Sequence, residues 1–164
     1  LCDETAIEFQ DSDGVLRTVV ADRDLTRAIR TAEAGQLASK VSVVPAVRER
    51  LVAKQRAMGT EGGLVMEGRD IGTKVFPDAA IKIYLTASAE ERARRRCADL
   101  AEGGIHVDPV GVAREIAERD RRDQERAHSP LRPAEDAVVV DTTGEDIDTV
   151  VAGLRALVER VSSA

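Results

Sequence analysis

The spacing of apolar residues along the chain predicts an alternation of strands and helices. Short runs rich in apolar residues at 63–67, 80–86 and 137–141 indicate buried strands, because a strand covered on both faces carries no polar side. Apolar residues that recur three or four positions apart predict helices over 31–44, 45–58, 89–101, 109–127 and 147–161. Strands that alternate with amphipathic helices favour a parallel sheet in an α/β fold, which binds ligands at the carboxyl ends of its strands.

Capping residues support the predicted helix ends. Thr31 and Asp108 are typical N-caps. Pro45 suits a first helical turn, because the N–H that proline lacks has no helical acceptor there. Ser88 and Glu91 have the spacing of a capping box at the start of the helix 89–101.

The two ends of the chain carry distinct patterns. Residues 6–9 and 15–20 are rich in β-prone side chains, and Asp11-Ser12-Asp13-Gly14 between them is typical of a turn, so we expect a hairpin. The last helix carries its apolar residues on one face, and we expect that face to be buried. Its members are Ile147, Val150, Val151, Leu154, Leu157, Val158 and Val161.

Composition excludes several classes of protein. The chain has 164 residues, of which 43% are apolar and 33% charged, as in a globular domain. No apolar run approaches the ~20 residues that span a bilayer, so we expect no membrane segment. Cys2 and Cys97 form no disulfide framework, which favours the cytoplasm, and Cys97 is expected in the core. His106 and His128 lack neighbours at metal-ligand spacing, which disfavours a zinc site.

Charge is distributed unevenly. The net charge of −6 argues against a general nucleic-acid binder. Only four of the 24 basic residues are lysines, and residues 92–126 hold nine arginines against eight acids. An overall excess of arginine can reflect genome composition, but a dense arginine segment in an acidic chain favours a focused anion site. The alternative is a solvated helix surface of compensating ion pairs.

The segment Glu67-Gly68-Arg69-Asp70-Ile71-Gly72-Thr73 follows a predicted strand. A glycine on each side lets the backbone turn and approach a ligand closely. In that interpretation Arg69 holds an anion and Asp70 accepts hydrogen bonds. The alternative interpretation is a capped turn with a local ion pair.

A second candidate lies on the predicted helix 109–127. Arg119, Arg122, Asp123 and Arg126 are spaced to share one helical face. Three guanidiniums around one carboxylate exceed what a single ion pair needs, and clustered arginine suits a transferring phosphoryl group. The alternative is again a charged surface helix. A third group, on the helix 89–101, repeats the pattern with Arg92, Arg95 and Arg96.

The motifs also have an order that resembles a known family. In sequence they are Ile29-Arg30-Thr31, Ala38-Ser39-Lys40-Val41, Pro45-Ala46-Val47-Arg48, residues 67–73, Val75-Phe76-Pro77-Asp78-Ala79, residues 85–92, residues 119–126 and Pro130-Leu131. Over essentially the whole chain they resemble bacterial cytidylate (CMP) kinases, which are nucleoside-monophosphate kinases of the P-loop superfamily.

The resemblance implies an architecture. It is a P-loop kinase-type parallel sheet flanked by helices, with an inserted small antiparallel subdomain that binds the nucleoside monophosphate, and a helical lid. On this chain the monophosphate-binding subdomain takes residues 1–60, the α/β core takes 61–101 and 127–164, and the lid takes 102–126.

The resemblance also implies roles for the acceptor side. Ser39, Arg48 and Asp70 match residues that read the cytosine base, which offers an N4 amino donor to a carboxylate and two acceptors to Arg and Ser. Arg30 matches a residue that supports the acceptor pocket.

Further roles concern the phosphates and the sugar. Arg69 and Arg126 match residues that hold the monophosphate, Arg119 matches one that reaches the transferring phosphate, and Asp123 matches one that binds the sugar hydroxyls. We expect Arg69, Arg119 and Arg126 to be the catalytic side chains.

The donor side completes the expected site. Arg92 and Arg95 belong to the helix that leads into the lid over ATP, and Glu67 can orient a magnesium-bound water. ATP is the expected phosphoryl donor, with Mg²⁺ as its counter-ion.

One departure from the family is large. The phosphate loop G-x-x-x-x-G-K-[ST], with its central strand, is absent from these 164 residues, and the first residue is Leu1. We therefore expect the chain to be the C-terminal portion of a longer kinase and to have no kinase activity alone.

The expected parent enzyme phosphorylates CMP or dCMP to the diphosphate. We expect it to be a cytoplasmic monomer when complete, with no membrane or nucleic-acid partner. Two alternatives remain: a related UMP or AMP kinase, and a non-catalytic fragment that binds a polyanion or a partner protein.

Overall fold

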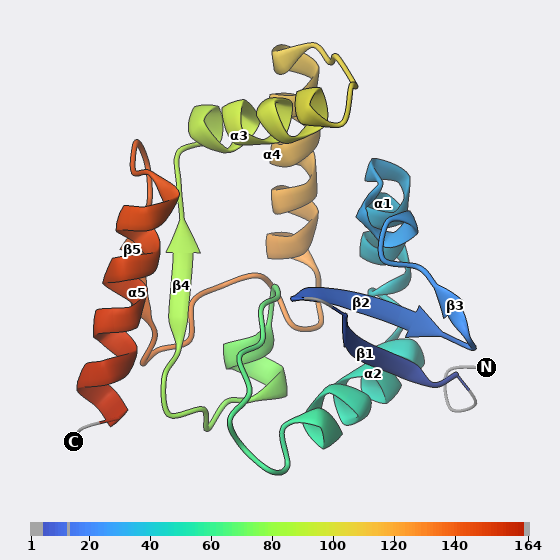
Figure 1. The fold of residues 1–164 in the computed structure, drawn as a ribbon, viewed down its shortest axis with the longest axis vertical. Coiled ribbons are helices and arrows are strands. Elements are labelled where there is room, and N and C mark those ends of the chain that lie inside the picture. The colour runs from blue at the N-terminus through green and yellow to red at the C-terminus, as the bar shows by residue number, and fades with distance from the viewer. Residues whose placement is uncertain (1–4, 13, 163–164) are drawn as a thin grey trace. The chain divides into compact units, whose positions relative to one another are not determined.

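The computed structural model describes residues 5–12 and 14–162 of the chain. They fall into two compact units, residues 1–64 and 65–164. Figure 1 colours the elements of both units in chain order. Leu1, Cys2 and Asp13, which entered the sequence predictions, lie outside the described residues.

The first unit contains an antiparallel sheet in the order β1-β2-β3, with strands Ile7–Ser12, Val15–Val20 and Arg23–Asp24. The first two strands pair from Ile7 opposite Val20 to Ser12 opposite Val15, which confirms the predicted hairpin. Gly14 has φ +76°, a left-handed conformation that glycine adopts without strain, and its N–H donates to Asp11 Oδ1 at 3.0 Å.

The helices of this unit begin where their caps predict. A short 3₁₀ turn, Ala28–Arg30, precedes α1 (Ala32–Val41), and α2 spans Pro45–Met58. Thr31 Oγ1 accepts the N–H of Ala34 at 3.1 Å, as an N-cap does. The helix α1 ends three residues earlier than its pattern predicts.

The second unit contains a parallel pair of strands, which confirms an α/β fold. Strands β4 (Ile83–Thr86) and β5 (Val138–Asp141) pair in parallel. Between them in the chain lie α3 (Ala89–Glu102) and α4 (Pro109–Glu125), which pack against each other (Figure 1). Helix α5 (Ile147–Ser162) follows β5, and a π-helical turn, η2 (Ile71–Val75), precedes β4.

The predicted strand at 63–67 is wrong. These residues are irregular, and the side chain of Val65 is 98% exposed. An apolar run marks a segment that can enter a sheet, but a strand forms only where a neighbour supplies hydrogen-bond partners. Within the described residues β4 pairs with β5, and no strand pairs with 63–67.

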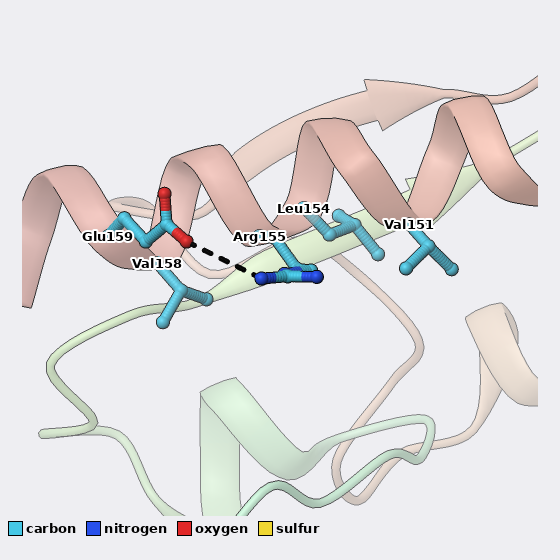
Figure 2. Close-up of a pocket in the computed structure, with 5 residues that line it drawn as sticks. All are labelled: Val151, Leu154, Arg155, Val158 and Glu159. Carbon is cyan, nitrogen blue, oxygen red and sulfur yellow. Dashed lines mark ion pairs between the residues drawn. The ribbon is translucent and has the colours of Figure 1, made fainter.

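The predicted burial of the α5 face is also largely wrong. Ile147 is 77% exposed, and Val151, Val158 and Val161 are exposed as well, while the remaining three members are half-buried. Figure 2 shows Val151, Leu154 and Val158 of this face beside the Arg155–Glu159 ion pair of 3.9 Å. Amphipathic spacing tells which face favours burial, and burial itself needs a covering element, which the described residues do not supply.

Few described residues are fully buried. The buried apolar side chains are Val75, Ala93 and Val112, while Cys97, expected in the core, is half-buried. Among the described residues, no helix is long and apolar enough to cross a membrane. In the second unit these buried side chains lie on η2, α3 and α4, the elements next to which the candidate site is built.

Candidate functional site

The loop before η2 is held in a tight conformation. A Cβ built on Gly68 would lie 2.8 Å from Ile71 Cγ1, so glycine permits a close approach there. The backbone carbonyl of Asp70 accepts the N–H groups of Lys74 at 2.8 Å and Val75 at 3.3 Å, and Val75 is buried. These contacts fix the backbone of the loop from which the Arg69 side chain extends.

Helix α4 supplies two carboxylates to the same region. Asp120 and Asp123 are three residues apart and so share a helical face, with side chains that are 14% and 5% exposed. The helix is anchored at its start by Asp108, whose carboxylate accepts the N–H groups of Val110 and Gly111. Burying two carboxylates is costly unless cations pair with them.

Four arginines from three segments provide those cations. Arg69 comes from the loop before η2, Arg92 from α3, and Arg119 and Arg126 from α4 and its C-terminus. We call these arginines, with Asp120 and Asp123, the arginine cluster.

Asp123 is the most buried member and meets three of the arginines. Its Oδ2 lies 3.3 Å from Arg69 Nε and 4.0 Å from Arg119 Nε. Its Oδ1 lies 3.8 Å from Arg126 NH1. Asp120 Oδ1 lies 3.4 Å from Arg69 NH2, and its Oδ2 accepts a hydrogen bond from Arg92 NH1. Arg69 therefore bridges the two carboxylates.

The arginine cluster has unused hydrogen-bonding capacity. Among the described residues, the buried nitrogens Arg92 Nε and Arg119 Nε have no hydrogen-bond acceptor, and Asp123 Oδ2 has no donor. Four guanidiniums against two carboxylates leave two positive charges in excess. The side chains of Arg92 and Arg119 are 37% and 44% exposed, so solvent reaches their outer ends. The arrangement can bind an anion that carries several oxygens.

Arg95 lies on the same helix as Arg92 but outside the arginine cluster. Its Nε donates to Glu91 Oε1 at 2.7 Å, and its two terminal nitrogens donate to Thr142 Oγ1 at 3.0 Å and to the Thr142 carbonyl at 2.6 Å. Thr142 is 5% exposed and in turn donates to the Thr86 carbonyl at the end of β4. We call Arg95, Glu91 and Thr142 the Arg95 junction, because they join α3 to the ends of both parallel strands.

The Arg95 junction also lowers the pKa of an acidic side chain, Glu91. The hydrogen bond from Arg94, together with that from Arg95, lowers the pKa of Glu91 from 4.5 to about 2. The predicted capping box forms in part: Ser88 Oγ accepts the N–H of Glu91 at 3.2 Å, but the Glu91 carboxylate turns to the two arginines. The N–H of Ser88 donates instead to Thr143 Oγ1.

The remaining predicted residues occupy separate places. Asp70 is half-buried at the start of η2, and Glu67 is exposed in the irregular segment 63–67. In the first unit, Arg48 NH1 donates to the Ser42 carbonyl, and Ser42 Oγ donates to the Ser39 carbonyl. Arg30 is exposed at the end of its 3₁₀ turn.

Besides Arg95, two arginines from the predicted groups lie outside the arginine cluster. Arg122, which the spacing places on the face of Asp123, is exposed and donates to the Glu118 carbonyl at 3.4 Å. Arg96 is half-buried on α3. The third guanidinium around Asp123 comes from Arg69, distant in sequence, and not from Arg122.

Sequence reasoning missed one member of the site. Asp120 lies within the charged run 118–126, yet no role was predicted for it. The available signal was its spacing of three residues from Asp123, which places two acids on one helical face beside the arginines.

Comparison with known proteins gives a consistent result. The sequence profile of the cytidylate kinase family matches residues 1–160. The chain is 52% identical over 153 residues to a cytidylate kinase of Pelotomaculum thermopropionicum, covering 93% of this chain and 66% of that protein. It is 47% identical to one of Aeromonas salmonicida (94% and 67%) and 48% identical to one of Pseudomonas aeruginosa (88% and 64%). The chain thus spans about two thirds of the length of these curated relatives.

Proposed function

The chain belongs to the cytidylate kinase family, and from this premise we propose that the protein transfers the terminal phosphoryl group of ATP to CMP or dCMP. The observation that carries the proposal is the arginine cluster, with its excess positive charge and its buried nitrogens without an acceptor. Phosphoryl transfer gathers negative charge on oxygens and depends on positioning and charge neutralisation, which such a cluster supplies.

Within the arginine cluster we assign each residue a separate role. Arg69 and Arg126 hold the phosphate of the acceptor nucleotide, and Arg119, whose side chain is 44% exposed, reaches the phosphoryl group in transfer. Asp123 Oδ2 has no hydrogen-bond donor among the described residues, so it can accept one from a sugar hydroxyl. Arg92 contributes the second unsatisfied nitrogen to the donor side. No covalent intermediate with the protein is required.

The base is recognised by other residues in this proposal. Asp70 accepts the N4 amino group of cytosine, while Ser39 and Arg48 donate to its ring acceptors, and Arg30 supports that pocket. We assign residues 1–60 to acceptor binding, 102–126 to the lid and the remainder to the α/β core. A carboxylate suits cytosine and repels the carbonyl that uracil carries at the same ring position.

The proposed reaction needs few contacts between Mg²⁺ and the protein. Mg²⁺ takes most of its oxygens from phosphates and water, so a single carboxylate reached through a water suffices. Glu67 is exposed at the start of the loop that bears Arg69 and is the residue we assign to that water. The ion supplies additional charge neutralisation for the nucleotide phosphates.

The proposal is tested by acceptor preference. The full-length protein is assayed for ADP release with ATP, Mg²⁺ and, in turn, CMP, dCMP, UMP and AMP. We expect the largest kcat/KM with CMP or dCMP. A larger kcat/KM with UMP or AMP, or binding of nucleic acid without turnover of any mononucleotide, contradicts the proposal.

The role of Asp70 is tested by Asp70→Asn. An amide can donate to the uracil carbonyl as well as accept from cytosine, so we expect the ratio of kcat/KM for CMP to that for UMP to fall about tenfold or more. Asp78→Asn is the matched control, since Asp78 is an exposed acid just after η2, and its ratio should equal that of the wild type. An unchanged ratio in Asp70→Asn removes Asp70 from base recognition.

A further inference from the structure

Asp120 has no role in the proposed function, although it connects two elements of the arginine cluster. Arg92, on α3, donates to its Oδ2, while Arg69, from the loop before η2, lies 3.4 Å from its Oδ1. The side chain is 14% exposed, so little water is available to replace these two contacts. One carboxylate therefore accepts a hydrogen bond from Arg92 and forms an ion pair, without a hydrogen bond, with Arg69, which is distant in sequence.

We propose that Asp120 is a positioning residue, which orients Arg92 for the phosphates through a hydrogen bond and keeps Arg69 beside it through an ion pair. The inference rests on the proposed function for its kinetic test. Arg92 gives one terminal nitrogen to Asp120 while its buried Nε keeps no acceptor among the described residues. The hydrogen bond restrains the Arg92 side chain, so that its remaining donors stay available for the phosphates.

A simpler role for Asp120 would be charge balance. The arginine cluster carries two excess positive charges, and removing Asp120 raises the excess to three. If the carboxylate only offsets charge, its removal strengthens the binding of anions. If it positions the arginines, its removal weakens binding and transfer despite the added positive charge. The two roles therefore predict opposite signs.

Asp120→Asn separates them, with Glu115→Gln as the matched control. Each substitution removes one negative charge from α4, and Glu115 is exposed and lies outside the arginine cluster. We expect Asp120→Asn to lower kcat with CMP and ATP about tenfold or more, because small displacements of positioning groups have large effects on rate. Isothermal titration should show inorganic pyrophosphate bound about threefold more weakly by this variant. Glu115→Gln should match the wild type in both measurements.

Asp120→Glu keeps the charge and moves the carboxylate by one methylene. We expect a kcat between those of the wild type and Asp120→Asn, whereas charge balance predicts a wild-type kcat. This variant decides the question even if Asp120→Asn does not fold, which thermal unfolding of each variant reveals. In the background Arg92→Ala, Asp120→Asn should lower kcat by a much smaller factor, since part of the effect acts through Arg92.

Different experimental results would contradict the role of Asp120 and the proposed function. A wild-type protein that does not phosphorylate CMP contradicts the proposed function, and pyrophosphate binding still decides the role of Asp120. Pyrophosphate bound more tightly by Asp120→Asn, or kcat within twofold of the wild type in both Asp120 variants, overturns the positioning role.

Discussion

Arg92 and Arg95 lie one turn apart on α3 and have opposite hydrogen-bonding situations. Arg95 donates to the side chain of Glu91 and to two oxygens of Thr142, at 2.6–3.0 Å. Arg92 hydrogen-bonds Asp120, and its buried Nε has no acceptor among the described residues. The Arg95 junction is thus complete without a ligand, and the arginine cluster is not.

On the proposed function, this difference separates an arginine whose donors are satisfied within the protein from arginines that are available to a ligand. A buried donor without a partner costs the folded protein roughly 1–3 kcal/mol, so an anion that satisfies it recovers that free energy on binding. A satisfied arginine offers no such gain. The arginine cluster should therefore respond to substitution mainly in activity, and the Arg95 junction mainly in stability.

The largest effect should come from Arg119→Ala. If Arg119 reaches the transferring phosphoryl group, its loss lowers kcat by about 10³, as for other arginines that stabilise this kind of transition state. The folded protein loses only a loose ion pair of 4.0 Å with Asp123. Steady-state kinetics with CMP and ATP, together with thermal unfolding, measure both quantities.

Arg121→Ala is the matched control for this prediction. Arg121 is exposed on the same helix and lies outside the arginine cluster. Its removal should leave kcat within about twofold of the wild type. Equal losses of activity in the two variants would mean that the general positive charge of α4, and not the position of Arg119, supports the reaction.

A smaller effect, and one on stability, is expected for Arg95→Ala. The variant loses the hydrogen bonds to both oxygens of Thr142. The side chain of Arg95 is 37% exposed, so water replaces part of the loss, and we expect the free energy of unfolding to fall by about 1–2 kcal/mol. Chemical denaturation measures it, with Arg94→Ala as control, because Arg94 is 68% exposed and pairs with Glu91 alone.

The activity of the same variant tests the sequence-based role of Arg95 at the lid. If Arg95 acts in the junction only, kcat/KM for ATP stays close to that of the wild type. A large loss in kcat/KM for ATP with unchanged stability would place Arg95 with the nucleotide and remove the contrast with Arg92.

The fold was predictable where its signals are local. Thr31 and Asp108 cap helices as expected, because a cap involves only residues two or three positions away. The run at 63–67 was mispredicted because strand formation depends on a partner strand, which the run itself does not specify. The exposed face of α5 has the same cause, since burial depends on a covering element.

The sequence predicted which residues belong to the site better than it predicted their hydrogen bonds and ion pairs. Arg69, Arg119, Asp123 and Arg126 were all expected to bind phosphate or sugar, and the structure brings them together. The spacing on α3 could not separate Arg92 from Arg95, because the hydrogen bond that distinguishes Arg95 reaches 47 residues along the chain. Asp120 was missed because its partners lie on two other segments.

The smallest expected effect concerns the pH dependence that Glu91 gives to the Arg95 junction. The pKa of Glu91 is about 2 in the folded protein against an ordinary value of 4.5, because Arg94 and Arg95 hydrogen-bond its carboxylate. Because the pKa of Glu91 is depressed in the folded protein, its carboxylate stabilises the folded state fully above the ordinary pKa, and this contribution is lost as the pH falls towards 2.

The difference in unfolding free energy between wild type and Glu91→Gln should therefore be constant above about pH 5 and shrink below it. At neutral pH, Glu91→Gln should keep the kcat of the wild type, because the junction is complete without a ligand. A difference that stays constant down to pH 2 would show that Glu91 is not held by the two arginines, and the contrast with the arginine cluster would then rest on Thr142 alone.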